Sequence, residues 1–208
     1  FELISSAKKV GIPVVYSVHD YYALSPEYNL LRRDGTYQGV PKDNEYYDQY
    51  LCLTYGKWRT SIRQAIDQVD CIVAPSNSAL AIFDQVYGDV GGSRYVIEHG
   101  TDSILQMKKS EEQKEKRGPV CFLGHINRHA KGRHLTTQVA SELAKRGQEV
   151  VFLGTKKIHW PTLKGQNGIH FCGPYHPTQL FELLQNIHPK LICLFSNWPE
   201  TFNYVLSE

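Results

Sequence analysis

Short apolar runs alternate with amphipathic stretches along most of the chain. The apolar runs are rich in β-branched side chains, which is typical of strands buried in a parallel sheet, and they span residues 12–18, 71–74, 94–98, 119–124, 149–154, 169–173 and 191–195. Apolar residues with helical spacing predict helices at residues 1–10, 58–69, 132–146 and 177–187, and at a segment capped by residues 75–78 that ends at residue 87. This alternation predicts an α/β protein with two parallel sheets flanked by helices.

Two segments interrupt the alternation. Residues 21–55 show no clear periodicity and hold eight of the 13 tyrosines. Tyrosine rings pack well on sugars, so one interpretation of this segment is an acceptor-binding loop. The alternative is an insertion that packs its own aromatic side chains. Residues 106–118, QMKKSEEQKEKRG, alternate charges with almost no apolar side chains, which indicates a solvated linker more than a partner-binding segment. The predicted domains are therefore residues 1–105 and 119–208.

Composition narrows the functional classes. The 208 residues carry 23 basic and 21 acidic side chains, with no basic stripe interleaved with aromatics, so a nucleic-acid partner is not expected. No apolar run approaches the roughly 20 residues of a membrane-spanning helix. Cys71, Cys121, Cys172 and Cys193 fall in predicted strands, where they are expected to be buried and reduced, and Cys52 lies in a loop. A cytoplasmic location is expected, and a peripheral contact with the inner face of the membrane stays open.

The last stretch of the chain concentrates the candidate chemistry. Residues 191–195 form a predicted strand, residues 196–199 supply turn chemistry, and an amphipathic helix is expected from Phe202. Such a junction collects unpaired backbone N–H groups that suit a phosphate. Glu200 and Glu208 bracket it, separated by roughly 10 Å if most of the interval is helical. This spacing allows one carboxylate to hold a sugar and the other a ribose, with a diphosphate between them.

The sequence SNWPETFNYVLSE at residues 196–208 resembles the E-x7-E signature of retaining family 4 glycosyltransferases, which have the GT-B fold of two Rossmann-like domains facing a cleft. The resemblance implies that Glu200 holds the donor sugar and Glu208 the ribose. It also implies that the backbone amides of Phe202, Asn203 and Tyr204 bind phosphate. Asn203 departs from the glycine that often follows the phenylalanine in this family.

Two segments of the N-terminal half also resemble this family. GIPVVYSVHD at residues 11–20 is similar to a strand of the first domain that delivers a His-Asp pair to its carboxyl edge, where ligands gather in parallel sheets. In relatives the histidine lies close to the donor sugar and the acceptor, so His19 is a candidate site residue, although a histidine at a strand end also serves as a capping or core group. VIEHGTD at residues 96–102 is similar to the turn that closes the family's first domain, with His99 in place of the common asparagine.

A second phosphate-binding pattern follows the predicted strand at residues 119–124. Gly124 and several basic side chains precede a helix, a geometry suited to a pyrophosphate. The segment resembles the family's G-R-(x)n-K-G pattern, whose arginine and lysine neutralise the diphosphate. Lys131 matches the lysine, whereas His125 stands in place of the arginine, so either Arg128 supplies the second charge or the diphosphate is held less tightly. An exposed lysine and arginine beside a turn are the simpler alternative.

The resemblance extends from Gly11 to Glu208, with the tyrosine-rich segment and the charged linker as gaps. It implies a glycosyltransferase that moves a sugar from a UDP- or GDP-sugar to a saccharide or lipid-linked acceptor with retention of configuration. His19, Glu200 and Lys131 are the expected catalytic residues, and Gly173 with Pro174 lies where relatives hold the nucleotide base. No cofactor and no metal are expected, because cations replace the metal and the sequence has no D-x-D motif.

Other interpretations stay open. One is a non-catalytic module or scaffold that binds a sugar or nucleotide-sugar, and another is a nucleotide-sugar epimerase or hydrolase on the same fold. The chain begins at Phe1 without methionine in a predicted helix and stops at Glu208 in another. Both domains are therefore expected to be truncated, since a glycine loop precedes the first segment and further helices follow the last one in relatives.

Overall fold

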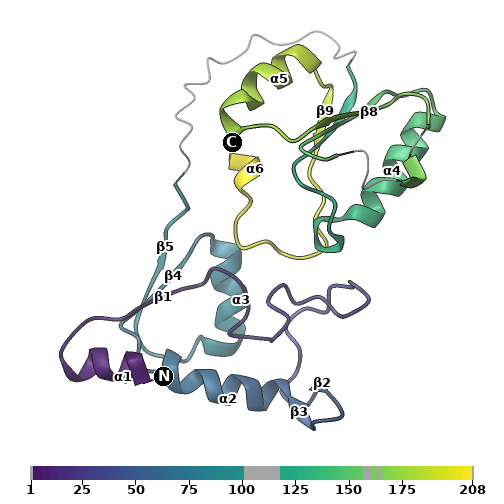
Figure 1. The fold of residues 1–208 in the computed structure, drawn as a ribbon. Helices are drawn as coiled ribbons and strands as arrows, with labels where there is room; N and C mark the ends of the chain where they lie inside the picture. Colours follow the sequence, from purple (N-terminus) through teal and green to yellow (C-terminus); the bar gives the residue numbers. More distant parts are fainter. Residues whose placement is uncertain (1, 101–117, 157–160, 164, 208) are drawn as a thin grey trace. The chain divides into compact units, whose positions relative to one another are not determined.

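The computed structural model describes residues 2–100, 118–156, 161–163 and 165–207. They fall into two compact units (Figure 1): the first comprises Phe1–Gly100 and Trp198–Phe202, and the second comprises Thr101–Asn197 and Asn203–Glu208. The predicted linker, residues 106–118, lies outside the described residues except for Gly118. In the described part of the chain, none of the helices has the length and apolar character that crossing a bilayer requires.

The first unit is built on a three-stranded parallel sheet in the order β1-β4-β5. Its elements are α1 (Glu2–Lys9), β1 (Val15–Ser17), β2 (Tyr46–Asp48), β3 (Leu53–Thr54), α2 (Tyr55–Ile66), β4 (Cys71–Ala74), α3 (Asn77–Tyr87) and β5 (Ser93–Val96). In β4, Ile72 and Ala74 are fully buried and pack in one core cluster with side chains of α2 and α3. Cys71 and Val73 alternate with them toward the other face and stay partly exposed.

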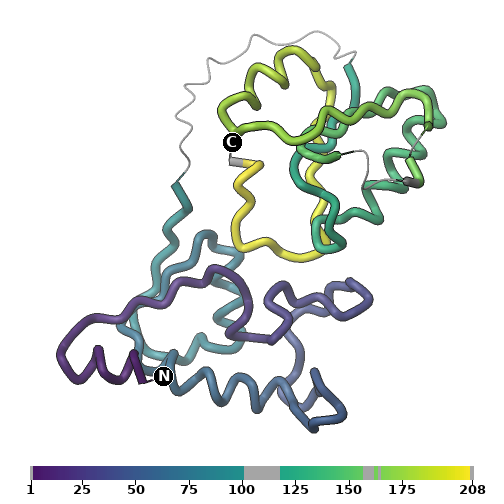
Figure 2. Tube along the Cα trace, viewed as in Figure 1, coloured from purple at the N-terminus to yellow at the C-terminus, as the bar shows by residue number. Residues whose placement is uncertain are grey.

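The tyrosine-rich segment is an ordered insertion that belongs to the same core. Figure 2 shows its irregular path from the end of β1 through the β2–β3 hairpin to α2. Tyr21, Leu24 and Leu30 are fully buried in the cluster that also contains α3. Three consecutive carbonyls accept hydrogen bonds from side chains of the helices, with donor–acceptor distances of 2.9 Å each: Tyr22 from Trp58, Ala23 from Tyr87, and Leu24 from Arg59. These contacts support the interpretation of an insertion that packs its own aromatics, and acceptor binding stays a prediction.

The second unit is a four-stranded parallel sheet in the order β8-β7-β6-β9. Its elements are β6 (Val120–Leu123), η1 (His129–Lys131), α4 (Arg133–Lys145), β7 (Val150–Leu153), η3 (Pro161–Leu163), β8 (Ile169–Gly173), η4 (Pro177–Gln179), α5 (Leu180–Ile187), β9 (Leu191–Cys193) and α6 (Tyr204–Ser207). Every residue of β6 and β7 is buried. One face of the sheet packs with α4 and the other with α5, so both central strands are covered on two sides.

The predicted fold class is confirmed at the level of a mixed α/β chain with two parallel sheets. Several element bounds differ from the prediction. Residues 12–18 contain only the short β1, and residues 191–195 are a strand only as far as Cys193. Residues 177–187 divide into η4 and α5, and the final helix begins at Tyr204, not at Phe202.

The predicted burial of the strand cysteines is only partly correct. Cys121 in the central strand β6 is fully buried, and this burial raises the pKa of its thiol to about 12. Cys172 is exposed, which contradicts the prediction. The physical reason is that β8 is an edge strand whose side chains alternate between partly buried and exposed positions. All five cysteines are free thiols.

Candidate functional site

Three adjacent strands of the second unit end in a glycine with positive φ. These are Gly124 after β6, Gly154 after β7 and Gly173 at the end of β8, with φ of 96°, 98° and 73°. A Cβ built on Gly154 would lie 3.0 Å from the backbone of Gly124. Only glycine allows the backbones to approach so closely in this conformation. The carboxyl edge of the sheet therefore offers backbone groups where ligands bind in open α/β sheets.

The segment after β6 carries the predicted basic residues. Residues 124–134 contain three lysine or arginine side chains, three histidines and no acidic residue. Ile126 is 4% exposed and anchors the segment in the core, whereas His125 and Arg128 are exposed. Lys131 is half-buried at the end of η1, directly before α4. The core anchor thus leaves cationic side chains on the surface at the start of a helix.

The exit of β9 lies against this segment, although the two are far apart along the chain. The backbone N–H of Asn197 donates to the carbonyl of Ala130 at 3.0 Å, and its amide Nδ2 donates to the carbonyl of His129 at 3.1 Å. Gly132, with φ of 73°, lies so close that a Cβ there would be 2.9 Å from the carbonyl oxygen of Phe195. The two segments predicted to hold a diphosphate are therefore joined in one unit, because β6 and β9 are neighbouring strands.

The next residues, Trp198–Phe202, belong to the first unit. Thr201 is 6% exposed, and its hydroxyl donates to the carbonyl of His19 at 2.7 Å. The carbonyl of Thr201 accepts a hydrogen bond of 2.9 Å from the hydroxyl of Ser76, which also accepts the N–H of Ala79 at the start of α3. Thr201, the residue that follows Glu200, is thus hydrogen-bonded to residues just past the ends of β1 and β4.

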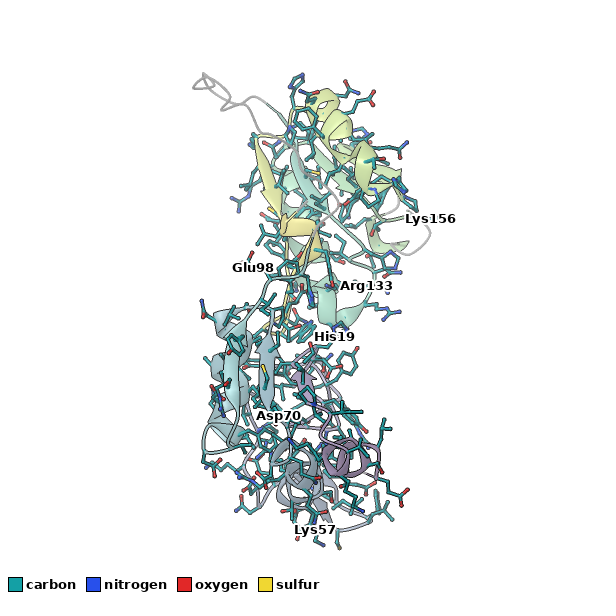
Figure 3. All side chains as sticks on the ribbon, turned by 90° about the vertical axis from the view of Figure 1, so that its left-hand side faces the viewer. His19, Lys57, Asp70, Glu98, Arg133 and Lys156 are labelled. Carbon is teal, nitrogen blue, oxygen red and sulfur yellow. The ribbon has the colours of Figure 1, made fainter. Side chains whose placement is uncertain are left out.

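Aromatic rings complete this region. Phe202 and His99 lie edge to face with ring centroids 5.1 Å apart, and the rings of His99 and His19 are 6.2 Å apart. Trp198 packs edge-on against Tyr21 and Tyr28. Figure 3 shows His19 at one end of the first unit's strands, with Asp70, which precedes β4, toward the other. His19 is exposed and His99 is half-buried, so the rings are within reach of a bound molecule.

The predicted site residues divide between the units. Gly124, His125, Arg128 and Lys131 occupy one segment of the second unit, and Gly173 with the exposed Pro174 lies two strands away on the same sheet edge. In the first unit His19, Glu200 and Phe202 are brought together around Thr201. Asn203 and Tyr204 return to the second unit, where the side chain of Asn203 accepts the N–H of Leu206 and so caps α6. Glu208 lies outside the described residues.

Sequence reasoning missed the residues that hold this region in place. Thr201, Ser76 and Trp198 contact partners far away in the sequence, and no local pattern marks those contacts. The only available indication was the alcohol beside Glu200, which is a hydrogen-bonding group in a segment already predicted to be functional.

Metal binding in proteins usually requires several histidine, cysteine or carboxylate side chains in one place. No cluster of three or more histidine, cysteine, aspartate or glutamate side chains has the required arrangement within the described ranges of the chain. No protein-family model matches the sequence, and comparison with curated proteins also finds no match.

Proposed function

We propose that this chain is part of a retaining glycosyltransferase of the GT-B type, similar to family 4, that transfers a sugar from a UDP- or GDP-sugar to a saccharide or lipid-linked acceptor. The contact between residues 129–130 and Asn197 carries the proposal, because it unites the two segments whose sequences resemble the family's donor site. Positive side chains, helix starts and backbone groups at a sheet edge are the chemistry that a nucleotide diphosphate requires.

In this proposal, Lys131 and Arg128 stabilise the negative charge that develops on the departing diphosphate. Electrostatic stabilisation of this kind commonly lowers the activation barrier more than any other effect in an enzyme. The segment between residues 124 and 134 suits the task, since it carries three lysine or arginine side chains and no acidic one. Gly173 and Pro174 would bind the nucleotide base through backbone groups, and Glu208 would bind the ribose.

Glu200 and His19 orient the donor sugar. The hydrogen bond from Thr201 to the carbonyl of His19 supports this pairing, because it ties the neighbour of Glu200 to the backbone of the histidine. A sugar held at both positions has fewer accessible orientations, which favours the reacting geometry.

Isothermal titration with UDP, GDP and their sugar conjugates tests the proposal. We expect one nucleotide to bind and Lys131→Ala to weaken it by about tenfold or more, since charge-assisted hydrogen bonds to phosphate are worth about 1.5–3 kcal/mol. Lys145→Ala removes the same charge from the exposed last turn of α4 and is the matched control, expected to bind normally. Absence of nucleotide binding, or equal loss in both variants, would count against a donor site at this edge.

The sequence departures favour a second candidate, a non-catalytic module that binds a nucleotide-sugar. His125 replaces the expected arginine, and Asn203 replaces the expected glycine and caps α6. Nucleotide binding without transfer to any saccharide or lipid-linked acceptor would support this candidate. Release of free sugar in the absence of an acceptor would instead indicate a hydrolase.

A further inference from the structure

The first unit contains a hollow of about 490 Å³ that no predicted site residue lines. Its walls are the loop before the β2–β3 hairpin, one side of α2 and the second half of α3; the lining residues are Val40, Pro41, Lys42, Asp43, Gly56, Arg59, Thr60, Arg63, Gln85 and Val86. Figure 3 places Lys57, the neighbour of Gly56, at the opposite end of this unit from His19. The volume is in the usual range for small-molecule sites, about 300–1,000 Å³.

Positive charge exceeds negative charge around the hollow. Three of the lining side chains are basic, Lys42, Arg59 and Arg63, and one is acidic, Asp43. Arg63 is engaged by Asp89, at 2.8 Å from its Nη2, and this contact holds the pKa of the Asp89 carboxyl below its usual range. Lys42 makes no ion pair with any residue that the structure describes. One cation therefore remains to attract an anion.

Arg59 is the unusual member of this group, because it is a guanidinium only 7% exposed. Its Nε donates to the carbonyl of Leu24 at 2.9 Å and its Nη1 to the carboxylate of Asp43 at 2.6 Å. Its Nη2 is buried and has no hydrogen-bond partner among the described residues. Buried donors of this kind are normally satisfied, so Nη2 is a donor that an acceptor oxygen of a ligand can satisfy.

The position of Asp43 allows such an oxygen to enter. Its side chain is 76% exposed and lies on the loop, whereas Arg59 is held by α2. An oxyanion that enters the hollow can therefore replace or share the carboxylate without moving either helix. Thr60 and Gln85 add polar groups on the two helices for the uncharged part of a ligand.

We propose that this hollow binds a small ligand with a carboxylate or phosphate group, about the size of a monosaccharide, through Arg59 and Lys42, with Asp43 as the internal competitor. The site is distinct from the proposed donor site and adds a second anion-binding position to the chain.

Spectra of the ¹⁵N-labelled chain, titrated with inorganic phosphate, glucose 6-phosphate, glucuronate and glucose, test this proposal. We expect saturable shifts of the Arg59 Nε–H and of the Lys42 and Thr60 amides with anionic probes, and none with glucose. Shifts with the two phosphates alone assign a phosphate ligand, and shifts with glucuronate alone assign a carboxylate. Absence of saturable shifts at these groups with every anion overturns the proposal.

Two substitutions that change the charge of the hollow in opposite directions make the test more specific. Lys42→Gln should weaken anion binding about fivefold, the upper range for an exposed ion pair, and Asp43→Asn should strengthen it by removing the competitor. Lys9→Gln and Glu2→Gln make the same changes in net charge on the exposed surface of α1 and should leave the affinity unchanged. An affinity that follows net charge equally in all four variants overturns the proposal. These measurements use no nucleotide, so their failure leaves the donor site untouched.

Discussion

The two units place their candidate residues at the carboxyl ends of parallel strands by different physical means. In the second unit, glycines at strand ends allow backbone to approach backbone, and the contact between Asn197 and Ala130 follows from this approach. In the first unit, side chains such as Thr201 and Tyr87 donate to backbone carbonyls that are distant in the sequence. One arrangement depends on the absence of a side chain and the other on side-chain hydroxyls, so the two should respond differently to mutation.

Gly132→Ala, in the second unit, should cause the largest loss of stability among these substitutions. The new Cβ would occupy a left-handed conformation and lie 2.9 Å from the carbonyl oxygen of Phe195. We expect a loss of about 3 kcal/mol in unfolding free energy, from backbone strain and steric overlap together. Hydrogen exchange at the β6 amides would report it.

Gly147→Ala is the control for that experiment. It has nearly the same φ, 75°, but no atom within 4 Å of the added Cβ. Only the conformational strain of about 1 kcal/mol should remain. Equal losses in both variants would contradict the idea that close backbone approach determines the edge of the second unit.

Thr201→Val should give the next largest effect, now in the first unit. The substitution keeps the shape and removes the hydroxyl that donates to the partly buried carbonyl of His19, at a cost of about 1–2 kcal/mol. The His19 ring should also move, which a shift of its ¹³C–¹H resonances would detect. Thr137→Val, which removes a local hydrogen bond within α4, should change stability by less than about 0.5 kcal/mol. An unchanged His19 resonance would argue that Thr201 does not position this residue.

The free energy of unfolding should depend on pH through the buried tyrosine side chains of the first unit. Burial raises the pKa of Tyr87 to about 12, with a smaller opposing effect from Arg59. Because the unfolded phenol ionises near pH 10, the folded state is favoured below that value and loses this advantage as the pH rises from 10 to 12. At pH 11 the loss is about 1 kcal/mol.

Urea unfolding between pH 9 and pH 11 measures this loss. Tyr87→Phe should flatten the decline, whereas Tyr95→Phe, at a position 53% exposed, should not. A decline of unchanged slope in Tyr87→Phe would assign the alkaline sensitivity to other groups, of which Tyr21 and Tyr16, whose pKa values burial also raises, are the first to consider.

The parts of the fold that sequence could predict are those whose cause is local. The residues 71–74 and the Ser76 cap of α3 agree with the structure, because apolar runs and capping side chains act within a few residues. Motif resemblance marks Lys131 as a candidate site residue, but only the adjacency of β6 and β9 explains why its neighbour Gly132 lies against Phe195.

The other features could not be predicted, because they depend on contacts between residues that are far apart in the sequence. The exposure of Cys172 depends on which strand lies at the sheet edge, and the apolar pattern of residues 169–173 does not state the strand order. The hollow beside Arg59 likewise depends on a loop, α2 and α3 meeting in space. The donor-site roles of Lys131, Glu200 and His19 stay predictions until a nucleotide is shown to bind.

The run of carbonyls at residues 22–24 also has a consequence for the order of folding. Its three hydrogen bonds come from Trp58, Arg59 and Tyr87, at sequence separations of 35 to 64 residues, and not from neighbours in a ladder or helix. Contacts of such separation form only after the entropy of closing the intervening chain has been lost. We therefore expect the segment that follows His19 to reach its native path only after α2 and α3 are in place, so that this end of β1 is among the last parts of the unit to become ordered.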